Sequence, residues 1–333
     1  MHHARRLVTV PAVLLLAAAS VLLAPLWIPA LALGDALRPR RRGARLRAGA
    51  MLAVYLQCEA AGLAASLALW LASPFGGASA HERFLRGNLA LQTWWATTLF
   101  AAARRIYGLG LEVEGEEAVA RGPLLLLPRH ASIADTLLPA VLLTAPHGIR
   151  LRYVLKRELL WDPCLDVVGR RLPNVFVRRG SEDAEREIAA VRELARGLGR
   201  DEGVLIYPEG TRFDPRKRAR ILERLRASGD SARAARAERL RHLLPPRRGG
   251  PQALLEAAPE ADVVFCAHTG FEGATSLADL WRGELVGRCV RVRFWRVPRA
   301  EIPDGRPARI EWLDGWWERI DAWIDAQFGA ATP

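Results

Sequence analysis

Leu124-Leu-Leu-Leu-Pro-Arg-His-Ala-Ser-Ile-Ala-Asp135 is the stretch of sequence that decides the fold, because four leucines lead directly into a turn with a histidine and an aspartate. A short apolar run bounded by glycine and proline is typical of a buried strand. Similar runs alternate with amphipathic helical segments, at residues 151–155, 175–177, 204–207, 263–266 and 290–295. This alternation predicts an α/β domain over residues 106–330.

His130 and Asp135 lie five positions apart, directly after this predicted strand. In an unbroken helix their side chains would point about 140° apart, so they can meet only if His130 lies in the turn and the helix begins near Ser132. Two roles for Asp135 then stay open. It can cap the helix at the third position, as in a capping box. It can also hold His130 in one tautomer, which leaves the other ring nitrogen to remove a proton.

A second predicted strand end, Val204–Phe213, carries Glu209, Gly210 and Arg212 in its turn. Glycine permits backbone conformations that other residues resist, and a guanidinium offers a planar fork suited to phosphate. Between the two motifs, residues 174–180 form another strand end with two arginines. Since ligands bind beyond the carboxyl ends of the strands in open α/β sheets, the three strand ends predict one pocket.

Taken together and in this order, the motifs resemble the glycerolipid acyltransferase family, the lysophosphatidic acid and lysophospholipid acyltransferases. His130 and Asp135 match the family's His-x4-Asp motif. Residues 176–179 match Phe-(Ile/Val)-x-Arg, and residues 207–212 match (Phe/Tyr)-Pro-Glu-Gly-Thr-Arg. The resemblance spans about residues 111–271 and implies an α/β fold with a mixed sheet flanked by helices.

The resemblance implies an O-acyltransferase in which Asp135 orients His130 as general base. A free hydroxyl of lysophosphatidic acid or another lysophospholipid would attack the thioester of acyl-CoA or acyl carrier protein. These are co-substrates, and we expect no cofactor and no metal ion. Arg179 and Arg212 would hold the acceptor's phosphate, and Glu209 would order them or contact the acceptor. The expected substrate-binding residues are Arg179, Glu209, Gly210, Thr211 and Arg212.

Three features depart from the family pattern. Arg129 stands where the family often has asparagine, and the segment 262–268 lacks the proline of the family's fourth motif. A basic insert, residues 214–248, follows the third motif and resembles the subgroup that acts on lysophospholipids with larger headgroups. We interpret the insert as a solvated helix or hairpin, with binding to anionic lipid as the alternative.

The first 105 residues have the composition of a membrane-embedded or interfacial helical region. Two apolar runs, residues 7–33 and 48–73, flank an arginine-rich linker, and residues 89–103 form a shorter third run. The first two are long enough to span a bilayer, although Pro25 and Pro29 would kink or end the first. A cleaved signal peptide is the alternative for that run. We expect a bacterial inner-membrane protein with its active site on the cytoplasmic side; the number of crossings and the oligomeric state stay open.

Half of the 333 residues are hydrophobic and the formal net charge is +12, which excludes disordered, collagen-like and disulfide-scaffold proteins. The positive net charge predicts an anionic partner: nucleic acid, a lipid headgroup or a phosphorylated small molecule. The alternative function is a basic membrane-associated scaffold or nucleic-acid-binding protein without catalysis. No base-reading motif accompanies the arginines, so we expect no nucleic-acid partner. A serine hydrolase is disfavoured because Gly-x-Ser-x-Gly is absent from the sequence.

Several further residues carry weaker expectations. A tryptophan-rich amphipathic helix over residues 309–328 either packs on the domain or docks at the membrane interface. We interpret His268 as a strand-end histidine whose polar atoms are satisfied locally, with lining of the acyl-donor site as the alternative. His242 has no partner at a telling spacing in the sequence and is expected at the surface, and Asp166 is expected to pair with nearby arginines.

Overall fold

The computed structural model describes residues 2–37, 43–73, 78–178, 184–272 and 274–330. The chain divides into two compact units, each built from several segments. The first unit comprises residues 1–110, 137–181 and 276–288, and the second comprises residues 111–136, 182–275 and 289–333. The sequence instead predicts a division of the chain at residue 105, into a membrane-associated part and an α/β part. The two compact units do not test that division.

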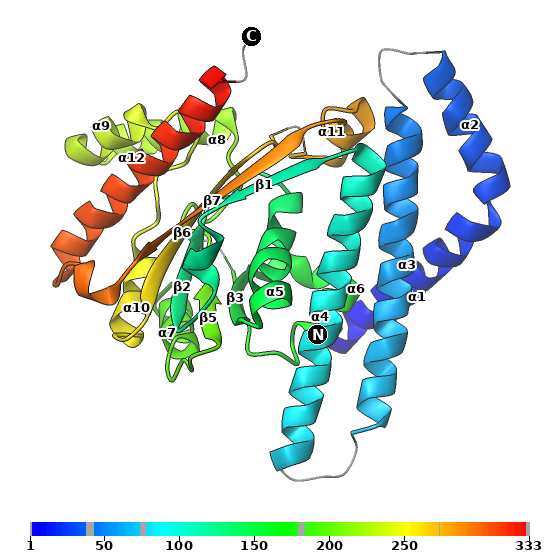
Figure 1. Ribbon diagram of the computed structural model, residues 1–333, viewed down its shortest axis with the longest axis horizontal. Helices are drawn as coiled ribbons and strands as arrows, with labels where there is room; N and C mark the ends of the chain where they lie inside the picture. Colours follow the sequence, from blue (N-terminus) through cyan, green and yellow to red (C-terminus); the bar gives the residue numbers. More distant parts are fainter. Residues whose placement is uncertain (1, 38–42, 74–77, 179–183, 273, 331–333) are drawn as a thin grey trace. The chain divides into compact units, whose positions relative to one another are not determined.

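Four helices open the first unit: α1 His2–Leu22, α2 Ala24–Ala36, α3 Ala44–Leu71 and α4 Ala78–Tyr107. The predicted apolar run 7–33 is broken at Leu23, and Pro25 lies in the first turn of α2, where proline is tolerated. By length and composition, Ala4–Leu22 and Ala44–Leu71 could each cross a membrane. The third apolar run forms part of α4, which lies side by side with α3 (Figure 1).

One face of α3 packs against α4 and the segment around Cys164. The carboxylate of Glu59 is buried in the middle of this helix and accepts hydrogen bonds from the Trp95 indole at 2.8 Å and the Cys164 backbone N–H at 3.0 Å. Cys164 belongs to α6, Pro163–Val168. A buried carboxylate needs such partners, so this face of α3 is fixed against α4 and α6.

Asp166 of α6 holds the start of α1. Its carboxylate, which is fully buried, accepts hydrogen bonds from Arg5 at 2.7 Å and Arg6 at 2.9 Å, and from Arg170 at 2.8 Å. Burial opposes ionisation, but the three guanidinium groups hold the pKa of Asp166 below its usual range. The prediction that Asp166 pairs with arginines is confirmed.

The rest of the first unit carries a short parallel pair of strands. β3 Arg150–Lys156 pairs with β4 Val175–Val177 in register from Val154 opposite Val175. Two further helices belong to this unit, α5 Ala145–His147 and α11 Leu277–Arg282.

A mixed sheet forms the second unit, in the strand order β1-β7-β6-β2-β5. The strands are β1 Gly110–Glu114, β2 Leu124–Pro128, β5 Glu202–Leu205, β6 Asp262–Thr269 and β7 Cys289–Val297. β2 is parallel to both β5 and β6, whereas β7 is antiparallel to β6. All five residues of β2 are buried, as expected of a central strand with both faces covered. Helices α7 Ala184–Leu194, α10 Gly249–Ala257 and α12 Arg306–Ala330 accompany the sheet. The predicted α/β fold with a mixed sheet flanked by helices is confirmed.

The basic insert forms a helical hairpin, α8 Pro215–Ala227 and α9 Ser231–Arg239. Asp214 and Asp230 cap the two helices by accepting backbone N–H bonds. A small apolar core joins them, made of Leu222, Leu225, Ala234 and Ala237. The hairpin interpretation is confirmed.

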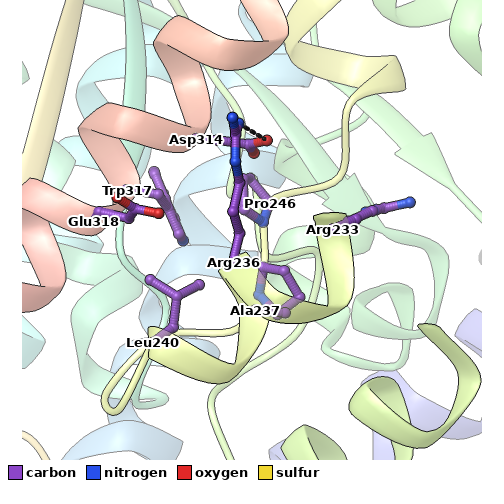
Figure 2. Close-up of a pocket in the computed structure, with 9 residues that line it drawn as sticks. Arg233, Arg236, Ala237, Leu240, Pro246, Asp314, Trp317 and Glu318 are labelled. Atoms are coloured by element: carbon purple, nitrogen blue, oxygen red, sulfur yellow. Dashed lines mark hydrogen bonds and ion pairs between the residues drawn. The ribbon is translucent and has the colours of Figure 1, made fainter. Parts of the chain in front are cut away.

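Acidic side chains of α12 neutralise arginines of the insert, and Figure 1 shows α8 and α9 beside α12. The pairs are Arg236 with Glu311 and Asp314, Arg239 with Glu318, and Arg241 with Asp325. Figure 2 shows a shallow pocket at this junction, where Arg236 reaches Asp314 beside Trp317 and Leu240. None of the predicted site residues lines it.

The tryptophan-rich face of α12 packs on the sheet. Trp317 is fully buried and its indole N–H donates to the Leu244 carbonyl at 2.9 Å. Trp316 stacks on Phe265 of β6 with ring centroids 4.7 Å apart, and Trp323 meets Trp295 of β7 edge-on. Packing on the domain, the first of the two interpretations of this helix, is confirmed.

Replacing Trp317 with alanine should lower the free energy of unfolding by about 3–5 kcal/mol, because the change empties a fully buried site. Trp317→Phe keeps most of the apolar packing and should cost less. The control is Trp161→Ala, since Trp161 is 65% exposed and its removal should cost within about 0.5 kcal/mol. Denaturant unfolding of the three variants measures this; equal losses for Trp317→Ala and Trp161→Ala would contradict it.

Candidate functional site

The site lies at the carboxyl ends of three parallel strands of the second unit. β2 leads into His130, β5 leads into the turn that carries Glu209, and His268 is the second-last residue of β6. Carboxyl ends of adjacent parallel strands lie at one edge of a sheet. The sequence predicted the contributions of β2 and β5 but not that of β6.

His130 and Asp135 meet in this loop. Nδ1 of His130 lies 3.1 Å from Oδ1 of Asp135, and their side chains are 10% and 1% exposed. The chain reaches this contact through an irregular loop, and a 3-10 turn begins only at Ala134. His130 thus lies in the turn, and its side chain meets that of Asp135, as the five-residue spacing allows.

Asp135 makes the contacts that both of the roles left open by the sequence require. Its Oδ2 accepts hydrogen bonds from the backbone N–H groups of Ala131 and Ser132, both at 2.7 Å, while the carboxylate also contacts His130. Ser132 departs from a capping box, because its Oγ accepts from the Ala134 N–H at 3.0 Å. Burial alone would raise the pKa of Asp135, but the two neighbouring imidazoles, His130 and His268, hold that pKa well below its usual range.

The contact with Asp135 assigns the tautomer of His130. Because Nδ1 faces a carboxylate that can only accept, Nδ1 carries the proton and Nε2 presents a lone pair. Among the described residues, hydrogen bonds to this ring are found at Nδ1 only. The Tyr207 ring covers His130 with centroids 4.3 Å apart. Such an imidazole can accept a proton at Nε2.

The turn after β5 fixes the backbone of His130 on both sides. Glu209 accepts the His130 N–H at 2.7 Å on one oxygen and the Leu244 N–H at 2.9 Å on the other. Phe213 N–H in turn donates to the His130 carbonyl at 2.8 Å. Glu209 is buried, and burial raises its pKa to about 8 against the opposing effect of the two N–H donors and Arg129. Both carboxyl oxygens of Glu209 therefore bind main chain.

The other motif residues surround this turn. Gly210 has φ of +68°, and a Cβ there would lie 2.7 Å from Nε of Arg247. Thr211 Oγ1 accepts from the Lys217 ammonium at 3.1 Å. Arg212 is half-buried and donates to the Thr275 carbonyl at 2.8 Å.

Arg179 lies outside the described residues, so its expected part in phosphate binding stays a prediction. Phe176 and Val177 of the same motif form β4 in the first unit. The guanidinium of Arg170 covers the Phe176 ring at 5.6 Å.

Sequence reasoning missed a buried network behind Asp135. Arg129 is buried, and its Nη1 donates to Glu272 at 2.7 Å and to the His268 carbonyl. Burial opposes ionisation of Glu272, but the Arg129 charge holds the pKa of Glu272 below its usual range. The available signal was Arg129 itself, because an arginine directly after a fully apolar strand requires a buried anion.

The two remaining histidine interpretations need correction. His268 is only partly satisfied: Nε2 lies 3.4 Å from Asp135 Oδ2, whereas Nδ1 is buried without a hydrogen-bond partner among the described residues. His242, expected at the surface, is half-buried, and its Nε2 lies 3.0 Å from Asp325 of α12, a partner 83 positions away in the sequence. Both contacts join segments distant in sequence, so local spacing does not indicate them.

Comparison with known proteins finds that the chain is similar to acyltransferases. Residues 110–264 match the family model described as Acyltransferase. The lyso-ornithine lipid O-acyltransferase of Pseudomonas aeruginosa is 31% identical over 121 residues, which are 36% of this chain and 41% of that protein. The chain thus spans about two fifths of the length of this curated relative. The crystal structure of the 1-acyl-sn-glycerophosphate (LPA) acyltransferase PlsC from Thermotoga maritima is similar with a TM-score of 0.49 and 13% identity, covering 78% of this chain and 87% of that chain.

Glu209→Gln should change how stability depends on pH. With a pKa raised from 4.5 to about 8 in the folded protein, Glu209 keeps a proton that the unfolded chain has lost. The unfolding free energy of the wild type should therefore fall as the pH rises between these values. Glutamine does not ionise, so it contributes no such loss of stability. The variant should therefore gain stability relative to the wild type as the pH rises from 5 to 9. Unfolding at a series of pH values tests this, and a difference that does not vary with pH would contradict it.

Gly210→Ala should be more destabilising than Gly229→Ala. Both glycines have positive φ, +68° and +75°, so both changes carry the left-handed backbone cost of about 1–2 kcal/mol. Only residue 210 also meets Arg247; a Cβ at 229 has no atom within 4 Å. In an Arg247→Ala background the two losses of unfolding free energy should become equal. An unchanged difference in that background would show that Arg247 is not the cause.

Proposed function

We propose that this chain transfers a fatty acyl group from acyl-CoA or acyl carrier protein to a free hydroxyl of lysophosphatidic acid or another lysophospholipid, since residues 110–264 match the family model described as Acyltransferase. The observation that carries the proposal is the contact of Nδ1 of His130 with Asp135 at 3.1 Å. This contact leaves the Nε2 lone pair of a nearly buried imidazole to act as a base.

The reaction needs one base and no covalent acyl-enzyme. Nε2 of His130 takes the proton from the acceptor hydroxyl as its oxygen attacks the carbonyl carbon of the thioester. The C–S bond then breaks, and the proton passes from Nε2 to the departing thiolate. The products are an ester and a free thiol. Asp135 stabilises the imidazolium between the two proton transfers.

Cationic and hydroxyl groups near the turn after β5 support an anionic acceptor. Arg212 uses one guanidinium N–H to bind the Thr275 carbonyl, and a guanidinium has five N–H donors. Thr211 stands next to it and Lys217 contacts both residues. We assign the acceptor's headgroup to Thr211 and Arg212. Phosphate binding by Arg179 stays a prediction from the sequence. The Pseudomonas relative acts on lyso-ornithine lipid, which makes that lipid the other acceptor to test.

Exposed apolar side chains on the N-terminal helices support a location in the membrane. Large residues of α1 and α2 are more than two-fifths exposed, among them Leu7, Leu15, Leu22, Leu26 and Leu33. A lipid surface is the environment that would cover such side chains. We assign the protein to the bacterial inner membrane with its site on the cytoplasmic side, where the arginine-rich linker would also lie.

The alternative of a basic scaffold or nucleic-acid binder predicts free arginines. In the basic insert, several arginines are instead paired with carboxylates of α12. These ion pairs leave less positive charge for an external anion, so the enzyme proposal is favoured.

The test is acyl transfer by the full chain in detergent or liposomes. Labelled acyl-CoA and acyl carrier protein are each offered with lysophosphatidic acid, other lysophospholipids and lyso-ornithine lipid. An ester should form with at least one acceptor, and His130→Ala should lower its rate by about 10²–10⁴-fold. The control is His81→Ala, since His81 is exposed on α4 and should leave the rate unchanged. Failure of the folded wild type to form ester from any acceptor would contradict the proposal.

A further inference from the structure

We propose that His268 is a positioning residue for the pair His130–Asp135, an inference that rests on the proposed function. His268 is the second-last residue of β6 and is 1% exposed. Its Nε2 lies 3.4 Å from Oδ2 of Asp135. The carboxylate of Asp135 therefore lies between two imidazoles: that of His130, the proposed base, and that of His268, which is buried.

The surroundings of His268 assign its tautomer. Nε2 faces two acceptors, Asp135 Oδ2 and the Arg129 carbonyl at 3.3 Å, so Nε2 carries the proton. Nδ1 is buried and has no hydrogen-bond partner in the described part of the chain. Nδ1 has no acceptor to receive a proton, which also favours the tautomer with the proton on Nε2.

The role of this ring follows from how the two oxygens of Asp135 are used. Oδ2 receives the backbone N–H groups of Ala131 and Ser132 at 2.7 Å and faces the His268 Nε2–H. Oδ1 is the oxygen nearest Nδ1 of His130. Donors on Oδ2 fix the plane of the carboxylate and draw its charge away from His130. His268 therefore sets both the direction and the strength of the base.

Arg129 and Glu272 fix the position of His268. The Arg129 guanidinium donates to the His268 carbonyl and to Glu272, and Glu272 accepts the Gly270 N–H at 2.7 Å. Phe271 meets the imidazole edge-on at 5.8 Å. The charged and titratable groups near this ring are therefore Asp135 and Arg129 from the loop after β2, Glu272 from the loop after β6, and His130 across Asp135.

The experiment compares His268→Leu with His268→Gln in the acyl-transfer assay. Leucine removes the donor to Asp135, so kcat should fall about tenfold with little change in KM. With one donor fewer, Asp135 attracts the His130 imidazolium more strongly, and the acid limb of kcat/KM should shift to higher pH. Glutamine can place an N–H near the position of Nε2, so His268→Gln should return the acid limb of the kcat/KM profile to its wild-type pH. His242→Leu removes a histidine–aspartate contact elsewhere in this unit and should leave the limb unchanged.

A limb that does not move in His268→Leu would overturn the proposal, even if the rate falls, because loss of folded protein lowers the rate equally at every pH. A long-range ¹⁵N–¹H spectrum of the wild type gives a readout without activity. It should show the His268 proton on Nε2, the nitrogen that faces Asp135, and a ring protonated on Nδ1 alone would overturn the proposal. If the wild type acylates no acceptor while this spectrum is as expected, the proposed function fails and the placement of His268 stands.

Discussion

The carboxylate of Asp135 is the point on which the site depends. It accepts two backbone N–H groups at the start of a turn and contacts the imidazoles of His130 and His268. A buried carboxylate survives only when its lone pairs are satisfied, and here the donors come from the loop after β2 and from the end of β6. The groups that make the loop fold are thus the groups that orient the base. A change that disturbs this carboxylate affects folding and chemistry together.

Glu209 extends this constraint to the rest of the second unit. It joins the His130 N–H to the Leu244 N–H, and the Leu244 carbonyl accepts the indole N–H of Trp317. A continuous set of hydrogen bonds therefore runs from α12 through the end of the insert to the catalytic loop. The insert is more than a surface addition, because its last residues complete the shell around His130. The ion pairs between α9 and α12 hold that end of the insert in place.

The features that local sequence determines were predictable. Short apolar runs located β2, β5 and β6, helical spacing located the buried stripe of α12, and Pro25 marked the break in the first apolar run. The motif spacing also brought His130, Asp135 and Glu209 into one site. The supporting contacts were not predictable. Arg129 meets His268 and Glu272 about 140 positions away, and only the pairing of β2 with β6 brings them together. His242 and Asp325 are likewise joined by the packing of α12.

The central claim is that His130 and Asp135 act as one catalytic unit, and a double-mutant cycle on kcat/KM tests it most directly. The cycle compares the wild type with His130→Ala, Asp135→Asn and the double variant, using the acceptor that the wild type prefers. Residues that act as a unit have strongly non-additive effects. We expect Asp135→Asn to lower kcat/KM in the wild-type background and to have no further effect once His130 is alanine. Equal losses from Asp135→Asn in both backgrounds would contradict it.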